Sequence, residues 1–328
     1  MRELQLMMYS LVAAILLGKI LIPYFQRLKV GQSIREEGPK SHLVKGGTPT
    51  MGGFIFIIAS LIVTAFTINI DLKLGAILGS MVAFGSIGFA DDYIKVVLKR
   101  NLGLRAKEKL IGQFVFSGIL AFIGYQISSA IWIPFTDYYL ELGLFYIPFM
   151  MFVIIGTTNA VNLTDGLDGL NTSVTIIVSS FFLVATAMLN IANLESFLYV
   201  MIAALFGFLL FNKYPAKVFM GDLGSLGLGG FVVATAIVTN TVLLLPIVGI
   251  IYFAETISVI LQVAYFKRTK KKGIIGANGK PGVRLFKMAP LHHHYEHCGW
   301  SEVKIVLIFS VITAVMSGIG YLTLLARI

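Results

Sequence analysis

The chain has 328 residues, of which 57% are hydrophobic and 13% are charged. A soluble domain has roughly 45–50% apolar and 25% charged residues, so this composition excludes a soluble globular protein and predicts an all-α polytopic membrane protein. The polar connections are all short, and we expect a single membrane domain over residues 1–328. The formal net charge of +10 must be located along the chain before nucleic acid is considered as a partner.

Apolar windows long enough to cross about 30 Å of hydrocarbon, at roughly 18–22 residues each, predict about ten transmembrane helices. They lie near residues 4–26, 53–70, 74–91, 110–131, 143–160, 172–190, 196–212, 223–239, 243–266 and 301–325. Ten helices place both termini on the same side of the membrane. Between the fourth and fifth windows, the alternation of residue types over 138–142 predicts a small hairpin.

Lysine and arginine are concentrated in alternate connections. Loops 27–50, 92–109, 159–171, 212–222 and 267–300 together hold 21 of the 26. By the positive-inside rule these loops are cytoplasmic and both termini are on the outer side. This distribution explains the net charge and predicts no nucleic-acid partner.

The connection from Asn159 to Asn171 carries acidic and amide side chains between two long apolar segments. Polar side chains and turn-forming residues at the edge of a bilayer indicate a site that holds a polar ligand. If residues 164–171 form a helix, Asp165 and Asp168 lie on one face and suit sugar hydroxyls, ammonium groups or a divalent cation. The alternative is a tight turn that uses Asp and Gly for its backbone geometry.

Further acidic residues lie at the cytoplasmic ends of other predicted spans. Asp91 and Asp92 end the third span, where ionised carboxylates are costly and therefore indicate function. Adjacent residues on a helix point about 100° apart, which favours different roles for the two. Asp222 begins a later span and is either a ligand for Mg²⁺ or a helix N-cap. Phe219, just before it, could stack on a planar base.

The sequence has four other notable features, and two of them have two interpretations. The glycine-rich stretch after Lys45 suits an anion or simply the start of a span. Glu255 and Gln262 share one helix face and should point into the protein. The basic run 267–272 is interpreted as an orienting patch that contacts lipid headgroups. The consecutive histidines 292–294 suit zinc, or contact with phosphate or substrate.

Carboxylates, cations and an aromatic ring on one cytoplasmic face fit Mg²⁺-assisted phosphoryl transfer from a soluble donor to a lipid acceptor. A transporter is the alternative from another functional class. It should carry its carboxylates near the middle of the bilayer, on broken helices in related halves. Here the acidic residues gather at the inner ends of spans, which favours the enzyme.

Three motifs, in order along nearly the whole chain, closely resemble the polyprenyl-phosphate N-acetylhexosamine-1-phosphate transferases. They are Asp91-Asp92-x-x-Lys95, Asn159-x-x-Asn162-x-x-Asp165-Gly-x-Asp168-Gly and Phe219-Met-Gly-Asp222. Residues 286–300, which include the three histidines, are similar to the branch of the family that uses a muramoyl-pentapeptide donor.

The resemblance implies transfer of phospho-MurNAc-pentapeptide from UDP-MurNAc-pentapeptide to undecaprenyl phosphate, which forms lipid I and UMP for peptidoglycan synthesis. It implies Mg²⁺ as the cofactor and a homodimer in the bacterial inner membrane. The active site would face the cytoplasm and lie open to membrane lipid, because withdrawing a polyprenyl tail costs about 0.8 kcal/mol per CH₂. A sister transferase that uses UDP-GlcNAc is the enzymatic alternative.

Residue roles follow from the same resemblance. Asp222 would bind Mg²⁺, Asp91 or Asp92 would help to ionise or orient the lipid phosphate, and Phe219 would stack on uracil. The residues expected around the nucleoside and sugar are Lys45, Asn162, Asp165, Asp168 and Gln262. Those expected to complete the polar site are Asn159, Asn212, Lys95, Lys107, His292, His293 and His294.

Overall fold

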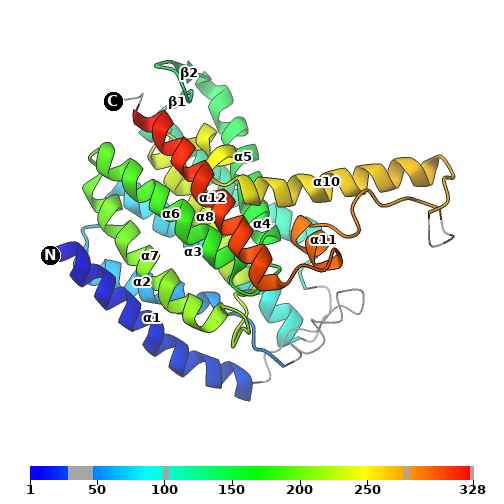
Figure 1. The fold of residues 1–328 in the computed structure, drawn as a ribbon. Helices are drawn as coiled ribbons and strands as arrows, with labels where there is room; N and C mark the ends of the chain where they lie inside the picture. The colour runs from blue at the N-terminus through cyan, green and yellow to red at the C-terminus, as the bar shows by residue number, and fades with distance from the viewer. Residues whose placement is uncertain (29–46, 99–102, 277–278, 280, 326–328) are drawn as a thin grey trace.

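The computed structural model describes residues 1–28, 47–98, 103–276, 279 and 281–325 (Figure 1). The helices of the bundle are α1 (Arg2–Arg27), α2 (Gly53–Thr67), α3 (Leu72–Val96), α4 (Ala106–Ile127), α5 (Tyr146–Leu163), α6 (Leu170–Met188), α7 (Ala192–Asn212), α8 (Gly221–Val238) and α12 (Glu302–Leu325). Counting α5 with the short 3-10 helix before it and including α10 (Ile250–Lys271), nine helices in the described part are apolar and long enough to cross a membrane. The prediction of an all-α polytopic membrane protein is confirmed. The predicted second span is α2, which at 15 residues is shorter than the other nine.

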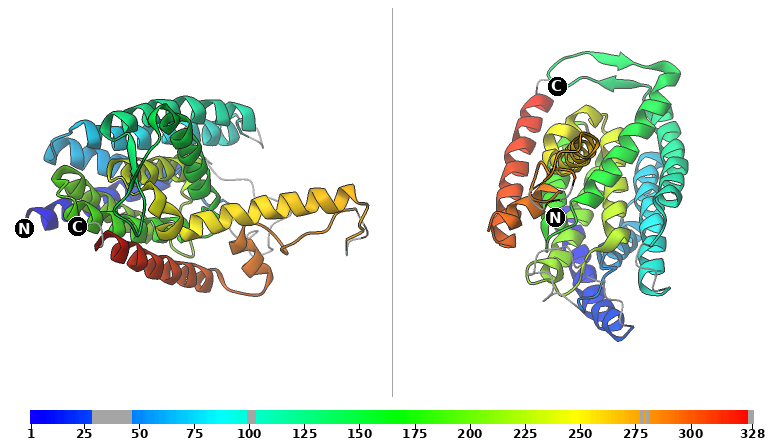
Figure 2. Two further views of the ribbon diagram at one scale, coloured as in Figure 1. Left: turned by 90° about the horizontal axis from the view of Figure 1, so that it is seen from above. Right: turned by 90° about the vertical axis from the view of Figure 1, so that its right-hand side faces the viewer.

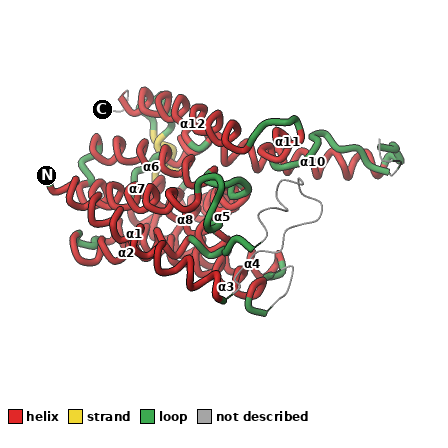
Figure 3. The backbone as a smooth tube through the Cα atoms, turned by 60° about the horizontal axis from the view of Figure 1, so that its bottom comes forward, coloured by secondary structure: helices red, strands yellow, loops and turns green. Residues whose placement is uncertain are grey.

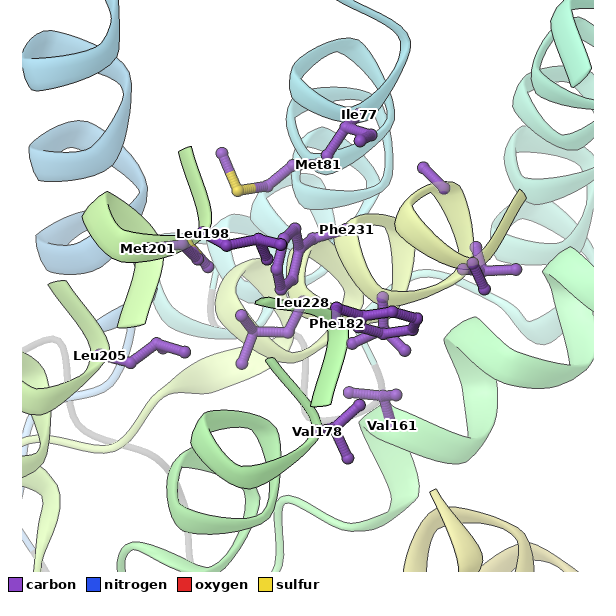
Figure 4. Packing of buried hydrophobic residues seen from close by; sticks show 14 of the residues in the cluster. Ile77, Met81, Val161, Val178, Phe182, Leu198, Met201, Leu205, Leu228 and Phe231 are labelled. Carbon is purple, nitrogen blue, oxygen red and sulfur yellow. The ribbon is translucent and has the colours of Figure 1, made fainter. Parts of the chain in front are cut away.

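Helix α8 lies at the centre of the bundle, and Asp222 is the only one of its residues that is not buried. Its many glycines let neighbouring backbones approach closely, as small residues do between membrane helices. A Cβ atom on Gly230, for example, would lie 2.7 Å from the carbonyl oxygen of Ser80 in α3. Phe231 and Leu228 of α8 are packed among side chains of α3, α6 and α7 (Figure 4). The core of the molecule is therefore built around α8.

A small hairpin lies at the end of the bundle opposite α11 (Leu291–His297) (Figure 1). Strands β1 (Ala130–Trp132) and β2 (Tyr139–Glu141) pair antiparallel, with Ile131 opposite Leu140. The short helix η2 (Gly143–Phe145) then leads into α5. The hairpin expected over residues 138–142 is thus confirmed, although its first strand begins two residues before Trp132.

The window predicted near 243–266 does not form one continuous helix, and its candidate membrane span is Ile250–Lys271. The chain forms η3 (Val242–Leu244) and the one-turn helix α9 (Leu245–Val248), then breaks at Gly249 before α10 begins. The non-helical backbone of Gly249 (φ −102°, ψ 29°) separates the two helices, while the proline of α9 lies in its first turn, where proline is tolerated. Helix α10 projects away from the bundle (Figures 1 and 2), and this leaves apolar side chains such as Ile257, Ile260 and Leu261 exposed.

After α10, the described part of the returning segment runs back beside this helix to the seven-residue helix α11 (Figure 3). Gln262 holds the two together, because its side-chain oxygen accepts hydrogen bonds from the backbone N–H groups of Leu285 (3.0 Å) and Phe286 (2.9 Å). Thr269 accepts a further bond from the N–H of Val283 at 2.9 Å. The arm formed by α10 and residues 281–290 therefore ends in α11, against the bundle.

Candidate active site

Three carboxylates converge where the end of α3 meets the start of α8. One oxygen from each of Asp91, Asp92 and Asp222 lies within 4.8 Å of the others. The two helices can approach because Gly88 has no side chain; a Cβ there would lie 2.0 Å from the backbone oxygen of Asp222. The positive φ of Gly221 (76°) is easily adopted only by glycine, and it leads the chain into α8 beside Asp92. Local backbone geometry therefore creates the cluster.

The Asp222 carboxylate is surrounded by hydrogen-bond donors from three other helices. Lys95 of α3 donates at 3.0 Å, Lys109 of α4 at 3.3 Å and the amide of Asn162 in α5 at 2.9 Å. Asp222 lies inside α8, one residue after its first residue, so the alternative N-cap role is wrong. This carboxylate is the point where α3, α4, α5 and α8 meet.

Asp91 and Asp92 are both buried but have different partners. Asp91 accepts the N–H of Leu104 at 2.7 Å and forms an ion pair with Lys95, one turn further along α3. Asp92 accepts the N–H of Leu223 at 3.0 Å. The different directions expected for adjacent helical residues are confirmed, while both side chains still reach Asp222.

Residues 164–169 form turns rather than the helix considered above, and α6 begins only at Leu170. Asp168 is buried, and one of its oxygens accepts the N–H of Ala216 at 2.9 Å, which ties this loop to the one before α8. Asp165 has no hydrogen bond from its side chain to any residue the structure describes. Burial, together with the charges of Asp222, Asp92 and Asp168, raises the pKa of Asp165 well above its ordinary value.

Two amide residues expected in the site mainly hold its frame. Asn159 pairs with Gln113 of α4 through two hydrogen bonds, at 2.9 and 3.2 Å. Asn212 is buried, accepts the hydroxyl of Thr172 at 2.8 Å and donates to the carbonyl of Val218 at 3.1 Å. Asn159 thus connects α5, which carries Asn162, to α4, which carries Lys109. Asn212 connects α6 to the loop that carries Phe219.

Phe219 belongs to a short extended stretch that enters α8. Its backbone N–H donates to Pro49 at 2.8 Å, and its carbonyl accepts the N–H of Gly52 at the same distance. A Cβ on Gly52 would lie 2.7 Å from that carbonyl oxygen, so glycine is needed for the contact. The ring is only partly buried and remains accessible near Asp222.

The three histidines of α11 have separate environments. His292 and Glu255 of α10 are both fully buried and form a pair, with 3.0 Å between Nδ1 and Oε1. The other ring nitrogen of His292 would lie 2.0 Å from a Cβ on Gly166, so this ring packs directly on the loop that carries Asp165. His293 contacts Glu296 at 2.8 Å, and His294 accepts the N–H of Lys287 at 3.2 Å. They do not converge as zinc ligands would.

Of two expected lysines, one lies outside the described residues and the other has no contact with the cluster, and a third lysine was missed. Lys45 falls outside the described residues, and Lys107 is exposed with no hydrogen bond or ion pair to any described residue. Lys109, two residues further along α4, is the lysine that reaches Asp222. It lies one turn before Gln113, on the helix face that meets α5. The four-residue spacing of Lys109 and Gln113 shows in the sequence that the two residues share a helix face.

The donor set suits a hard divalent cation. Three carboxylates from two rigid helices offer oxygen ligands of the kind that Mg²⁺ takes beside phosphate oxygens and water. Lys95 and Lys109 add two positive charges at the same point, so the cluster combines metal ligands with groups that bind phosphate. Such a site can bind and activate phosphorylated substrates.

Comparison with known proteins finds a family match that includes this site and extends well beyond it. Residues 74–240, which contain Asp91, Asp92 and Asp222, match the family described as Glycosyl transferase family 4. The chain belongs to this family. The matched range contains α4, α5 and α8 completely and all of α3 except its first two residues, so it includes every helix that builds the carboxylate cluster.

Individual relatives of the family are similar over almost their full length. The chain is 49% identical to a phospho-N-acetylmuramoyl-pentapeptide-transferase of Clostridioides difficile over 312 residues, which cover 93% of this chain and 92% of the relative. It is 49% identical to the enzyme of the same name from Clostridium perfringens strain 13, with 96% of both chains covered. The enzyme of that name from Caldanaerobacter subterraneus is 46% identical, again with 96% of both covered.

Proposed function

We propose that the chain transfers phospho-MurNAc-pentapeptide from UDP-MurNAc-pentapeptide to undecaprenyl phosphate and releases UMP. The observation that carries this proposal is the near-full-length identity of 49% to relatives named for this reaction. The carboxylate cluster supports it, because the reaction joins two phosphorylated substrates and needs their charges neutralised. The active site would face the cytoplasm at the inner membrane, as the distribution of lysine and arginine predicts.

Mg²⁺ would be held by Asp222 together with Asp91 or Asp92, and when bound it would neutralise charge on the phosphates. Lys95 and Lys109 would bind the non-bridging phosphate oxygens from the other side. Asn162 fixes the rotamer of Asp222 by donating to it at 2.9 Å. The separate backbone partners of Asp91 and Asp92 would hold two carboxylates in different orientations, one of which would orient the lipid phosphate.

Phe219 would stack on the uracil, because its partly exposed ring lies three residues before Asp222 on a stretch held by the backbone. Asp165 lies in the loop on which His292 packs, and at this loop both residues would contact the sugar. The homodimer stays a prediction of the family resemblance.

The experiment is a UMP-release assay with purified protein, undecaprenyl phosphate and Mg²⁺. UDP-MurNAc-pentapeptide is compared with UDP-GlcNAc, each with and without excess chelator. We expect chelator-sensitive release from the muramoyl donor alone. Release from UDP-GlcNAc alone would keep the chemistry and overturn the substrate, and no release from either donor would contradict the enzymatic proposal.

A further inference from the structure

The arm carries a pocket that the carboxylate cluster does not use. It has a volume of about 590 Å³ and lies between α10, the returning segment and the end of α11. Its apolar wall includes Val259, Val263 and Met288, and its cationic side chains are Lys267, Lys270, Arg284 and Lys287. A concave site with apolar walls and several converging charges is typical of a ligand-binding site rather than of a plain surface.

Only some of the cations at the end of α10 line the pocket. Lys267 and Lys270 are three residues apart, therefore share a face, and line the pocket. Arg268, Lys271 and Lys272 do not line it and remain for the lipid headgroups. Orientation in the membrane thus explains one group of cations but not the group in the pocket.

The pocket cations have no acidic partner among the residues that the structure describes. The sequence has no Asp or Glu from residue 256 to residue 295. None of the ion pairs among the described residues includes a pocket cation, and Lys287 donates only to the backbone oxygen of His297, at 3.0 Å. Unpaired cations in a hollow attract an anionic ligand, and the apolar walls favour one that also has apolar parts.

The pocket is connected to the proposed reaction site through α11. Lys287 and His297 of the pocket flank the helix whose His292 packs on Gly166 beside Asp165. Helix α11 has seven residues and is therefore about 10 Å long. An extended pentapeptide spans roughly 17 Å, so a peptide attached to a sugar near Asp165 is long enough to follow α11 into the pocket.

We infer that this pocket binds the peptide of the donor, with its C-terminal carboxylate held by Lys270 and Arg284. The inference rests on the proposed function, because the names of the relatives supply the pentapeptide and every unmodified peptide ends in a carboxylate. The arm then selects the donor by its peptide, while the carboxylate cluster carries out the transfer. A ligand of this class also explains why the wall combines apolar side chains with positive charge.

The test measures KM for two donors that differ only at the peptide C-terminus, one with a free carboxylate and one with a carboxamide. For the wild-type enzyme we expect a KM roughly three- to tenfold lower for the free acid, a difference that shrinks as salt is added. In a Lys270→Gln/Arg284→Gln variant the two donors should have nearly equal KM values. Both side chains are exposed, so the variant should fold normally.

The matched control is Arg268→Gln/Lys271→Gln, which also removes two positive charges, both from positions of α10 that do not line the pocket. It should retain the wild-type preference for the free acid. The inference is overturned if the Lys270→Gln/Arg284→Gln variant keeps that preference, or if its KM changes for undecaprenyl phosphate instead, which would make the pocket a lipid-headgroup site. If the wild-type enzyme releases UMP from neither donor, the proposed function itself fails, and this result is distinct from the other two.

Discussion

The carboxylate cluster and the projecting arm are held together in opposite ways. At the cluster, α3 and α8 touch backbone to backbone, because glycines such as Gly88 leave no side chain between them. On the arm, the returning segment is attached to α10 by side chains, chiefly Gln262 and Thr269. The first arrangement fixes the positions of the carboxylates, as phosphoryl transfer requires. In the second, the side chains that line the pocket can differ without moving the cluster. In the proposals above, the transfer takes place at the cluster and the peptide of the donor is bound on the arm.

The strongest test of the cluster is Asp222→Asn. The amide cannot replace a carboxylate that pairs with Lys95 and Lys109 and is proposed to bind Mg²⁺, so we expect kcat to fall by at least roughly 100-fold. UMP release measures the loss, and circular dichroism with thermal unfolding checks the fold. A well-folded variant with near-normal, Mg²⁺-dependent release would show that Asp222 is not essential to the chemistry.

The close approach of the helices is tested by Gly88→Ala. The added Cβ would lie 2.0 Å from the Asp222 oxygen, and because that atom is backbone, α3 and α8 must separate. We expect a loss of about 1–3 kcal/mol in the free energy of unfolding, together with a large loss of activity. Gly79→Ala is the control on the same helix, since nothing lies within 4 Å of its Cβ position. Equal behaviour of the two variants would contradict the account of the cluster.

Phe219→Ala tests the boundary between chemistry and recognition. Loss of stacking on a base costs roughly 1–3 kcal/mol, so KM for the donor should rise about tenfold or more while kcat changes little. Calorimetric titration with UMP gives the same comparison without turnover. Unchanged affinity for both nucleotide and donor would remove Phe219 from the nucleotide site.

The arm is tested by Gln262→Ala. Its amide oxygen accepts from two exposed or half-exposed backbone groups that water can satisfy instead, so the thermal unfolding temperature should stay nearly constant. KM for the donor should rise by roughly two- to fivefold as the pocket wall loosens. A fall in unfolding temperature as large as that of Gly88→Ala would mean that the arm is part of the stable core.

The smallest expected effect is on stability, in Asp165→Asn. The pKa of Asp165 is raised in the folded protein, so the folded state holds a proton that the unfolded state releases, and stability falls as pH rises through this range. An amide does not ionise, so the variant avoids this loss of stability. We expect its thermal unfolding temperature near neutral pH to be about 1–3 °C higher than that of the wild type. The gain should disappear near pH ~4, where the unfolded carboxyl is protonated. An unchanged or lower temperature at neutral pH would contradict the burial of charge at Asp165.

The lengths of the apolar windows predicted most of this architecture, because the thickness of the bilayer sets the length of a spanning helix. They did not predict the break at Gly249, since α9 and α10 together have the length and apolarity of one span. The acidic residues at helix ends were found because charge is costly there. The sequence shows that Lys109 and Gln113 share a face of α4, but not that this face meets α5, because that depends on packing between helices that are distant in sequence.

The central place of α8 has a consequence for how the protein is made. Apart from the short helix η3, its main packing partners α2, α3, α4, α5 and α6 all precede it in the chain. A chain inserted into the membrane from its N-terminus has therefore synthesised those partners before α8 itself. Helices α10 and α12 follow and are added at the outside of the bundle (Figure 1). The glycine-rich helix α8 therefore enters the membrane when most of the helices that pack around it have already been synthesised.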